Sequence, residues 1–402
     1  MDREAFGEVL ASLEPALAQQ FAVRQSLWES PEEEEAMITL KDLETVARLG
    51  KGNFGSVNIV RHKVTGRTYA LKKMSKEMIE KRGIMKYVTN ERYILSRIRC
   101  PFIVRLHRTY RTKHSVLFLM DVLIGGELQP RIINAPYMNP NSARFYAANI
   151  ALALIYMHER GVVHRDLKGE NVMIHQSGYL KLVDFGMATR LKKGQRAHTM
   201  CGTPEYVAPE IMTQGSGVGY GMAVDWWAFG VIVGLMMNKG RHPINIPLSC
   251  SLPKAWRVLV RYVEAYPSVR SLQMSDPDAQ DLVTRLLHPN SVRRMGMGKR
   301  GARGVMKHPF FAGVDWERMA NRQLDPPFVP EVKDLLDISN FHKGSSMSGA
   351  GASGGDGGEG KDSARGSADG RLKRRKSYIE DEVSVMSEED TTGPANRWDA
   401  VF

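Results

Sequence analysis

The sequence predicts an α+β protein of two lobes, a small antiparallel β-sheet lobe with one helix and a larger, mainly helical lobe. Two observations favour this fold class. Residues 43–124 contain short alternating apolar segments separated by turns such as Thr65-Gly66, a pattern typical of sheets built from hairpins. Residues 125–311 are mostly helical in their apolar pattern. We therefore expect an N-terminal segment at 1–42, the two lobes, and a tail at 312–402.

The N-terminal segment is expected to form a helix and an acidic linker. Its apolar residues share one helical face: Phe6, Val9, Leu10, Leu13, Leu17 and Phe21. Such a helix could dock on the core or lie on a membrane surface. The first interpretation is favoured because the polar face is not rich in basic residues. The run from Glu32 to Glu35 is expected to be solvated.

A glycine-rich turn lies inside the predicted sheet, at residues 50–57 (Gly-Lys-Gly-Asn-Phe-Gly-Ser-Val). Gly50, Gly52 and Gly55 remove side chains where a backbone must fold over phosphates, and their N–H groups can point at phosphate oxygens. The pattern alone would also fit a dinucleotide-binding turn. Here the turn joins two strands rather than a strand and a helix, which disfavours that alternative.

Five side chains downstream have the chemistry of phosphoryl transfer. Lys72 can place a compact positive charge on the α- and β-phosphates of ATP. Asn171 and Asp184 offer hard oxygen ligands that suit Mg²⁺. Asp166 can orient an attacking hydroxyl and accept its proton, and Lys168 can balance charge on the moving phosphate. Their order along the chain predicts phosphoryl transfer from ATP to a hydroxyl.

The larger lobe carries two clear helix signals. Asn139 is a plausible N-cap with Pro140 at the first helical position, and the helix should run to about Met157. The longest apolar run, from Trp226 to Met237, is too short to cross a bilayer and predicts a buried helix. We therefore expect no membrane insertion.

The composition of the tail changes near residue 344. Residues 344–370 are rich in Gly, Ser, Ala and Asp and are expected to be disordered. A basic run at 371–376 precedes Ser377. Ser377 is therefore a candidate site that this protein could phosphorylate on its own chain. The same segment could instead occupy the substrate groove as an inhibitor. A solvated charge run and a nuclear-import signal are the other interpretations.

Charge and cysteine content limit the partners and the location. The formal net charge of +12 invites a nucleic-acid interpretation, but no DNA- or RNA-binding motif is visible. Three widely spaced cysteines and the lack of a visible secretory signal favour a reducing interior. We expect no nucleic-acid partner and a cytoplasmic location, with the nucleus as an alternative.

Several longer stretches resemble one family. They are 164–171 (His-Arg-Asp-Leu-Lys-Gly-Glu-Asn, below called the catalytic loop), 184–186 (Asp-Phe-Gly), 201–210 (Cys-Gly-Thr-Pro-Glu-Tyr-Val-Ala-Pro-Glu) and 225–228 (Asp-Trp-Trp-Ala). From about Leu27 to Phe341 the chain resembles a serine/threonine protein kinase of the AGC group, most of all a cyclic-AMP-dependent catalytic subunit. The resemblance implies the bilobal kinase fold with an AGC-type C-terminal tail.

The resemblance also implies roles for matched positions. Glu91 is expected to pair with Lys72, and Asp225 to hold the catalytic loop. Glu210 should pair with Arg294. The side chains expected to link the lobes are Leu95, Leu106, His164 and Phe185. The ATP-binding positions are Gly50, Lys51, Gly52, Asn53, Phe54, Gly55, Ser56, Val57, Ala70, Lys72, Met120, Glu127 and Phe341.

Peptide recognition is implied at acidic and apolar positions. Glu127 and Glu170 match carboxylates that hold an arginine three residues before the acceptor Ser or Thr. Leu235 stands where another glutamate is usual, so a second arginine should matter less. The remaining positions expected to bind the peptide are Met200, Thr203, Pro204 and Val207. Thr203 is also expected to pair with Lys168.

Regulation is implied at Thr199, which matches the phosphorylated activation-loop threonine of many AGC kinases. A phosphate there needs basic partners, for which Arg165 and Arg190 are candidates. Tyr87 and Thr189 replace two partners that are usually basic. We therefore expect activity to depend only weakly on this phosphate.

The predicted function is phosphorylation of Ser or Thr in arginine-containing protein sites, with ATP and Mg²⁺, in cell signalling. Gly169 replaces the usual proline of the catalytic loop and is expected to loosen it without removing a reacting group. The alternative is a catalytically weak kinase-fold scaffold that binds a regulatory subunit. A regulatory subunit remains a candidate partner in either case.

Overall fold

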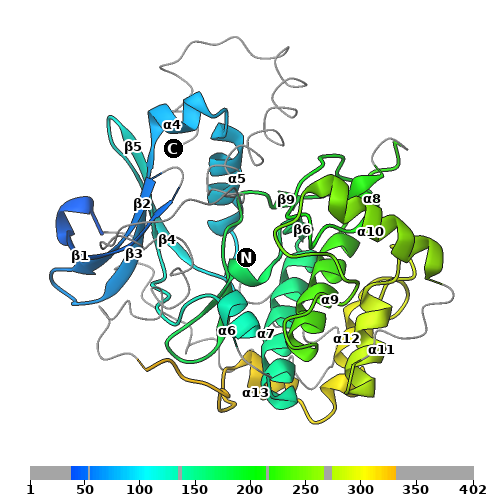
Figure 1. Cartoon of the computed structure of the whole chain (residues 1–402). Helices are drawn as coiled ribbons and strands as arrows, with labels where there is room; N and C mark the ends of the chain where they lie inside the picture. Colours follow the sequence, from blue (N-terminus) through cyan, green and yellow to red (C-terminus); the bar gives the residue numbers. More distant parts are fainter. Residues whose placement is uncertain (1–37, 53–54, 135–137, 214–216, 267–273, 332–402) are drawn as a thin grey trace, which may run out of the picture.

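A small β lobe sits above a larger helical lobe in the computed structural model (Figure 1). The structure describes residues 38–52, 55–134, 138–213, 217–266 and 274–331. The predicted two-lobe α+β arrangement is confirmed within them. The N-terminal helix and linker up to residue 37, Asn53, Phe54, Phe341, the segment at 344–370 and Ser377 lie outside the described residues and stay predictions.

The small lobe is a five-stranded antiparallel sheet in the order β1-β2-β3-β5-β4. Its strands are β1 (Leu43–Gly52), β2 (Gly55–His62), β3 (Thr68–Ser75), β4 (Leu106–Arg111) and β5 (Ser115–Met120). The predicted turn between β2 and β3 is present: Gly66 has a φ of 69°, which glycine adopts without strain, and its N–H donates to the carbonyl of His62. Strand β5 is buried along its whole length.

Two helices accompany the sheet, one more than expected. The short helix α4 (Lys76–Lys81) follows β3 directly, and Ser75 serves as its N-cap by accepting a hydrogen bond from the N–H of Met78. The predicted helix is α5 (Met85–Leu95), whose buried face contains Val88, Ile94, Leu95 and the single acid Glu91. The charge on that buried face needs a partner inside the protein.

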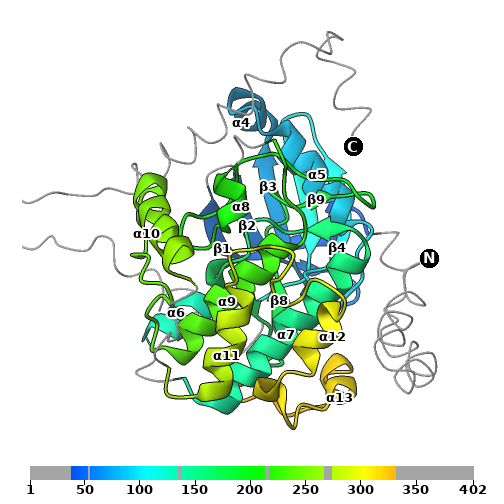
Figure 2. The same ribbon diagram turned by 90° about the vertical axis from the view of Figure 1, so that its right-hand side faces the viewer.

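Three helices form the centre of the large lobe: α7 (Pro140–Glu159), α9 (Ala223–Met237) and α11 (Pro277–Leu286). Figure 2 shows them side by side below the sheet. The side chain of Asn139 caps α7 by accepting from the N–H of Asn141, with Pro140 at the first helical position, as predicted. Every residue of α9 is buried, which confirms the buried helix.

Of the remaining elements, the first directly precedes β1 of the small lobe and the others belong to the large lobe. They are η2 (Leu40–Asp42), α6 (Leu128–Asn134), β6 (Val162–Val163), η3 (Gly169–Asn171), β7 (Val172–Ile174), β8 (Leu180–Leu182), β9 (Thr189–Arg190), α8 (Pro209–Met212), α10 (Leu252–Ala265), α12 (Gly301–Met306), η5 (Pro309–Phe311) and α13 (Trp316–Ala320). Strands β6 and β9 pair, as do β7 and β8. No helix in the described part of the chain is long and apolar enough to span a membrane.

Candidate active site

The catalytic loop is fixed by a carboxylate from beneath. The side chain of Asp225 in α9 accepts hydrogen bonds from the backbone N–H groups of His164 (2.8 Å) and Arg165 (2.9 Å), and it contacts the ring of His158 at 2.8 Å. Burial opposes its charge, but the hydrogen bonds with the His158 side chain and the His164 backbone outweigh burial and hold the pKa of Asp225 below its usual value. The role predicted for Asp225 is confirmed. Arg165 is held with a φ of 67°, a strained conformation for a residue with a side chain.

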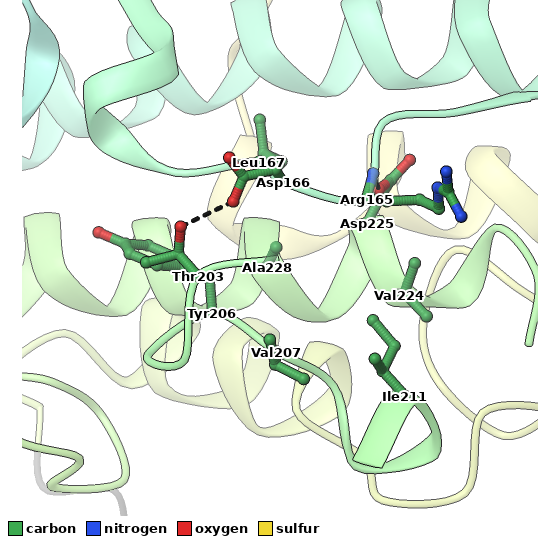
Figure 3. Close-up of a pocket in the computed structure, with 10 residues that line it drawn as sticks. All are labelled: Arg165, Asp166, Leu167, Thr203, Tyr206, Val207, Ile211, Val224, Asp225 and Ala228. Atoms are coloured by element: carbon green, nitrogen blue, oxygen red, sulfur yellow. Dashed lines mark hydrogen bonds between the residues drawn. The ribbon is translucent and has the colours of Figure 1, made fainter. Parts of the chain in front are cut away.

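Asp166 lies at the centre of a polar cluster above this anchor. One of its carboxylate oxygens accepts from the hydroxyl of Thr203 at 2.7 Å, as Figure 3 shows. The other accepts from the ammonium of Lys168 at 3.0 Å and from the side-chain amide of Asn171 at 3.2 Å. Lys168 also donates to Thr203 at 2.8 Å, which confirms the predicted pairing. These contacts leave the Asp166 carboxylate few ways to turn.

Lys72 and Glu91 form the predicted ion pair between β3 and α5. The ammonium contacts the two carboxylate oxygens at 2.8 and 2.9 Å. Burial disfavours the charge of Lys72, but the negative charges of Glu91 and Asp184 outweigh burial and raise its pKa, so it stays an ammonium. Burial also raises the pKa of Glu91. This pair explains the acid on the buried face of α5.

Asp184 follows β8 and faces the same region. Its φ of 61° is unusual for a residue with a side chain and turns the chain sharply before Gly186. Phe185 is fully buried, with its ring centroid 5.0 Å from that of His164. Leu95 and Leu106 belong to the same buried cluster, as expected for side chains that link the lobes.

The donor atoms near Asp166 fit a magnesium site. Asn171 uses its amide nitrogen to donate to the backbone carbonyl and the carboxylate of Asp166, so its amide oxygen is the atom that remains for a cation. Asp184 supplies a carboxylate. Two oxygen donors with room for phosphate and water oxygens are the usual magnesium arrangement. No cluster of three or more His, Cys, Asp or Glu side chains that could hold a metal occurs among the described residues.

The β1–β2 hairpin pairs with β3, the strand that carries Lys72. Gly52 pairs with Gly55, and Val57 pairs with Lys72 across β2 and β3. A Cβ atom on Gly55 would lie 2.8 Å from the backbone carbon of Lys73, so the close approach of two strands requires glycine there. At Gly50 no atom lies within 4 Å of the Cβ position, so space is open on that side.

Ala70 and Met120 lie opposite each other on β3 and β5, both buried. Together with the half-buried Val57 they place apolar side chains at the inner end of the cleft expected for the nucleotide base. Ser56 lies opposite Lys51 on the hairpin. The described small-lobe members of the predicted nucleotide site therefore lie on β1, β2, β3 and β5 of one sheet, whereas Glu127 lies outside that sheet, bridged to Met173 of β7.

Comparison with known proteins decides the family. The model of the protein kinase domain matches residues 43–311, more than half of the chain. The chain belongs to the protein kinase family. It is 38% identical to the serine/threonine-protein kinase sgk-1 of Caenorhabditis elegans over 307 residues, which are 76% of this chain and 64% of that protein.

Two other relatives support the resemblance of this chain to the AGC group. It is 35% identical to the cGMP-dependent protein kinase egl-4 of Caenorhabditis elegans over 85% of this chain and 44% of that protein. It is also 35% identical to a cAMP-dependent protein kinase catalytic subunit of Arthrobotrys oligospora, over 76% of this chain and 56% of that protein. The resemblance to AGC-group serine/threonine kinases is confirmed. The matched parts span about two thirds or less of each of these relatives.

The acidic residues predicted for substrate binding lie close together in the kinase. Glu127 precedes α6 and Glu170 lies in η3, and both reach solvent. Partial burial and then the negative charge of Glu170 raise the pKa of Glu127. The charge of Glu170 also acts on a third acid, Glu205, which the sequence interpretation did not name. It is buried, and burial raises its pKa against hydrogen bonds from backbone groups including that of Ser249.

The apolar positions predicted for substrate binding differ in how far they are exposed. Val207 is buried, Pro204 is half-buried and the side chain of Met200 is exposed. Glu205 lies between Pro204 and Tyr206 in the 201–210 segment. Its place in the sequence, next to Pro204 and two residues before Val207, is the signal that could have identified Glu205.

The surroundings of Thr199 differ from the prediction in one respect. Arg165 donates to the phenol oxygen of Tyr220 at 3.3 Å, and that phenol donates to the backbone carbonyl of Thr199 at 2.6 Å. Arg165 also donates to the carbonyl of Met187 at 2.6 Å. The arginine is therefore held near Thr199 through Tyr220, a partner that the sequence interpretation did not name. The side chain of Arg190 is exposed.

Proposed function

We propose that this protein is a serine/threonine protein kinase that transfers the γ-phosphoryl group of ATP to Ser or Thr in arginine-containing protein sites, in cell signalling. The observation that carries the proposal is the contact set of Asp166 with Thr203, Lys168 and Asn171. Family membership supports phosphoryl transfer. The acidic pair Glu127 and Glu170 supports the basic substrate class.

The cluster around Asp166 suits in-line attack by a hydroxyl. Thr203 and Lys168 each hold one carboxylate oxygen, so the carboxylate keeps one orientation in which it can align the substrate hydroxyl and take its proton. The same lysine can stabilise negative charge that develops on the phosphoryl oxygens. Both acts need only residues of the large lobe.

The phosphate end of the site comes from the small lobe. Glu91 holds the ammonium of Lys72 so that it can meet the α- and β-phosphates. ATP with Mg²⁺ supplies the transferable group and a cation that neutralises its charge. The oxygens of Asp184 and Asn171 would hold that cation. Backbone N–H groups of the β1–β2 hairpin would cover the phosphates.

The substrate class can be tested by a change at Glu127. The wild-type protein should prefer a peptide with arginine three residues before the serine over the matched alanine peptide by ~10- to 100-fold in kcat/KM, as expected for a charge-assisted pair. Glu127→Gln should reduce this preference to less than ~3-fold by lowering kcat/KM mainly for the arginine peptide. Initial rates with the two peptides measure it. ATP is kept saturating, because Glu127 is also an expected ATP-binding position.

The control for this prediction is Glu77→Gln, which removes an exposed carboxylate in the first turn of α4. It should leave the preference unchanged. If Glu127→Gln lowered kcat/KM equally for both peptides and left the preference intact, the assignment of Glu127 to arginine recognition would be wrong.

Thr199→Ala should retain at least about a tenth of the wild-type activity. Arg165 already has Tyr220 and the carbonyl of Met187 as partners, so the charge of a phosphate is not its only support. Peptide phosphorylation by the two purified proteins measures this, with Thr65→Ala in the small lobe as a control. Complete loss of activity in Thr199→Ala alone would show that the phosphate is indispensable.

We also propose a reducing, cytoplasmic location, with nuclear entry as the alternative. Cys100, Cys201 and Cys250 are all free thiols, which supports this proposal. The proposed partners are protein substrates with basic residues before the acceptor Ser or Thr, and a regulatory subunit is a further candidate partner.

A further inference from the structure

Gln129, Gly169 and Tyr206 meet at a contact that joins three separate segments. Gln129 lies in α6, Gly169 begins η3 of the catalytic loop, and Tyr206 lies in the 201–210 segment. The backbone before α6 is hydrogen-bonded to β7, which follows η3, through the N–H of Gly125 and the carbonyl of Ile174 at 3.0 Å. This pairing brings the start of α6 against the catalytic loop.

The fit between Gln129 and Gly169 explains why this chain has glycine at position 169. A Cβ atom there would collide with the amide oxygen of Gln129 and lie 3.0 Å from its Cβ and 3.1 Å from its Cδ. Gly169 does not have a positive φ, so backbone conformation does not demand glycine. The glutamine is 7% exposed and enclosed by protein, so it cannot easily move aside. The requirement is for space.

Tyr206 holds the glutamine in place. Its hydroxyl donates to the amide oxygen of Gln129 at 3.1 Å. Burial raises the pKa of Tyr206 strongly, while a hydrogen bond from the backbone of Gly169 acts in the opposite direction. The phenol stays protonated and donates to Gln129. A proline at 169 would lack that N–H group and would add ring atoms where the glutamine lies. The expected loosening of the loop is replaced by a packed contact.

Each partner in this contact adjoins a group assigned to the peptide. Gln129 lies two residues after Glu127, and Gly169 lies between Lys168 and Glu170. Tyr206 is followed by Val207, one of the apolar positions assigned to the peptide. We propose that Gln129 is a positioning residue that fixes these three peptide-binding segments relative to one another by fitting against Gly169 and accepting a hydrogen bond from Tyr206. This inference rests on the proposed kinase function.

A rescue experiment tests the proposal. Gly169→Ala should lower kcat/KM for the arginine peptide by ~10-fold or more, because small displacements of reacting and binding groups are costly. The KM for ATP should change less than ~2-fold, since Lys72 and the apolar positions Ala70 and Met120 lie on β3 and β5 of the other lobe. Adding Gln129→Ala should remove the collision and restore the double variant to the level of Gln129→Ala alone.

The controls separate positioning from general damage. Gln280→Ala removes a helical glutamine whose amide oxygen accepts from the N–H of Met274 far from the peptide site, and it should leave kcat/KM unchanged. Tyr206→Phe should lower kcat/KM about as much as Gln129→Ala, and the two changes together should cost no more than either alone. A double Gly169→Ala and Gln129→Ala variant no more active than Gly169→Ala, or a silent Gly169→Ala, would overturn the proposal. If Gly169→Ala fails to fold, the comparison of Tyr206→Phe, Gln129→Ala and their double variant decides the question.

A second readout keeps the two proposals distinguishable. Gly169→Ala should lower Tm by about 2–10 °C through overpacking, and Gln129→Ala should restore part of that loss. A wild-type protein that labels no peptide would reject both the proposed kinase function and the positioning role. Rescue of Tm by Gln129→Ala would still establish that Gln129 packs against Gly169. An active wild type without rescue in either readout would reject only the role of Gln129.

Discussion

Asp184→Ala is expected to lower kcat for peptide phosphorylation by at least ~10²- to 10³-fold, the scale seen when one preorganised charge-stabilising group is removed. Asp184 supplies the only carboxylate among the two residues assigned to magnesium, and Asn171 alone is a weak partner for a hard divalent cation. The conformation of Asp184 is strained, with a φ of 61°. Such strain is typical of a residue whose direction matters to a site.

Steady-state rates over a range of Mg²⁺ concentrations measure this effect. The variant should also need more Mg²⁺ for half-maximal rate. Asp325→Ala, which removes an exposed carboxylate beyond α13, should match the wild type at every concentration. An Asp184→Ala protein with more than half of the wild-type kcat at ordinary Mg²⁺ would refute the assignment.

Arg294→Ala is expected to lower the free energy of unfolding by about 3–5 kcal/mol, the cost of leaving one partner of a buried ion pair alone. The guanidinium is 1% exposed and contacts both carboxylate oxygens of Glu210, at 2.5 and 2.9 Å. It also donates to the backbone carbonyls of Ala223 and His288. Its loss would remove the guanidinium donor that these buried acceptors share.

Denaturant unfolding of the variant and the wild type gives the difference in free energy. Arg285→Ala is the matched control, because Arg285 contacts Asp281 at 2.8 Å with a side chain 57% exposed. An exposed pair of this kind should contribute less than about 1 kcal/mol. Equal losses in the two variants would show that the buried pair is no more important than the exposed one.

The local signals in the sequence were sufficient for much of the fold. A capping asparagine followed by proline predicted the start of α7, and an unbroken apolar run predicted the burial of α9. The pairs of Lys72 with Glu91 and of Arg294 with Glu210 were also predicted, from the family resemblance. The short helix α4 was missed because six residues provide too few periods for an apolar pattern.

The missed parts of the site depend on contacts between distant segments. The hydrogen bond from Tyr206 to Gln129 joins residues far apart in the chain, and neither residue carries a local signal of it. The bridge from Arg165 through Tyr220 to Thr199 is of the same kind. Residue type limits what each side chain can do, but packing of three segments decides which partners it meets.

Transfer of labelled γ-phosphate from ATP to a serine peptide with arginine three residues before the serine is the most direct test of the central claim. With Mg²⁺ present, the purified full chain should label the peptide, and labelling should stop when the metal is chelated or when Asp166 is replaced by alanine. A full chain that neither binds ATP with Mg²⁺ nor labels any peptide would contradict the account and favour a kinase-fold scaffold.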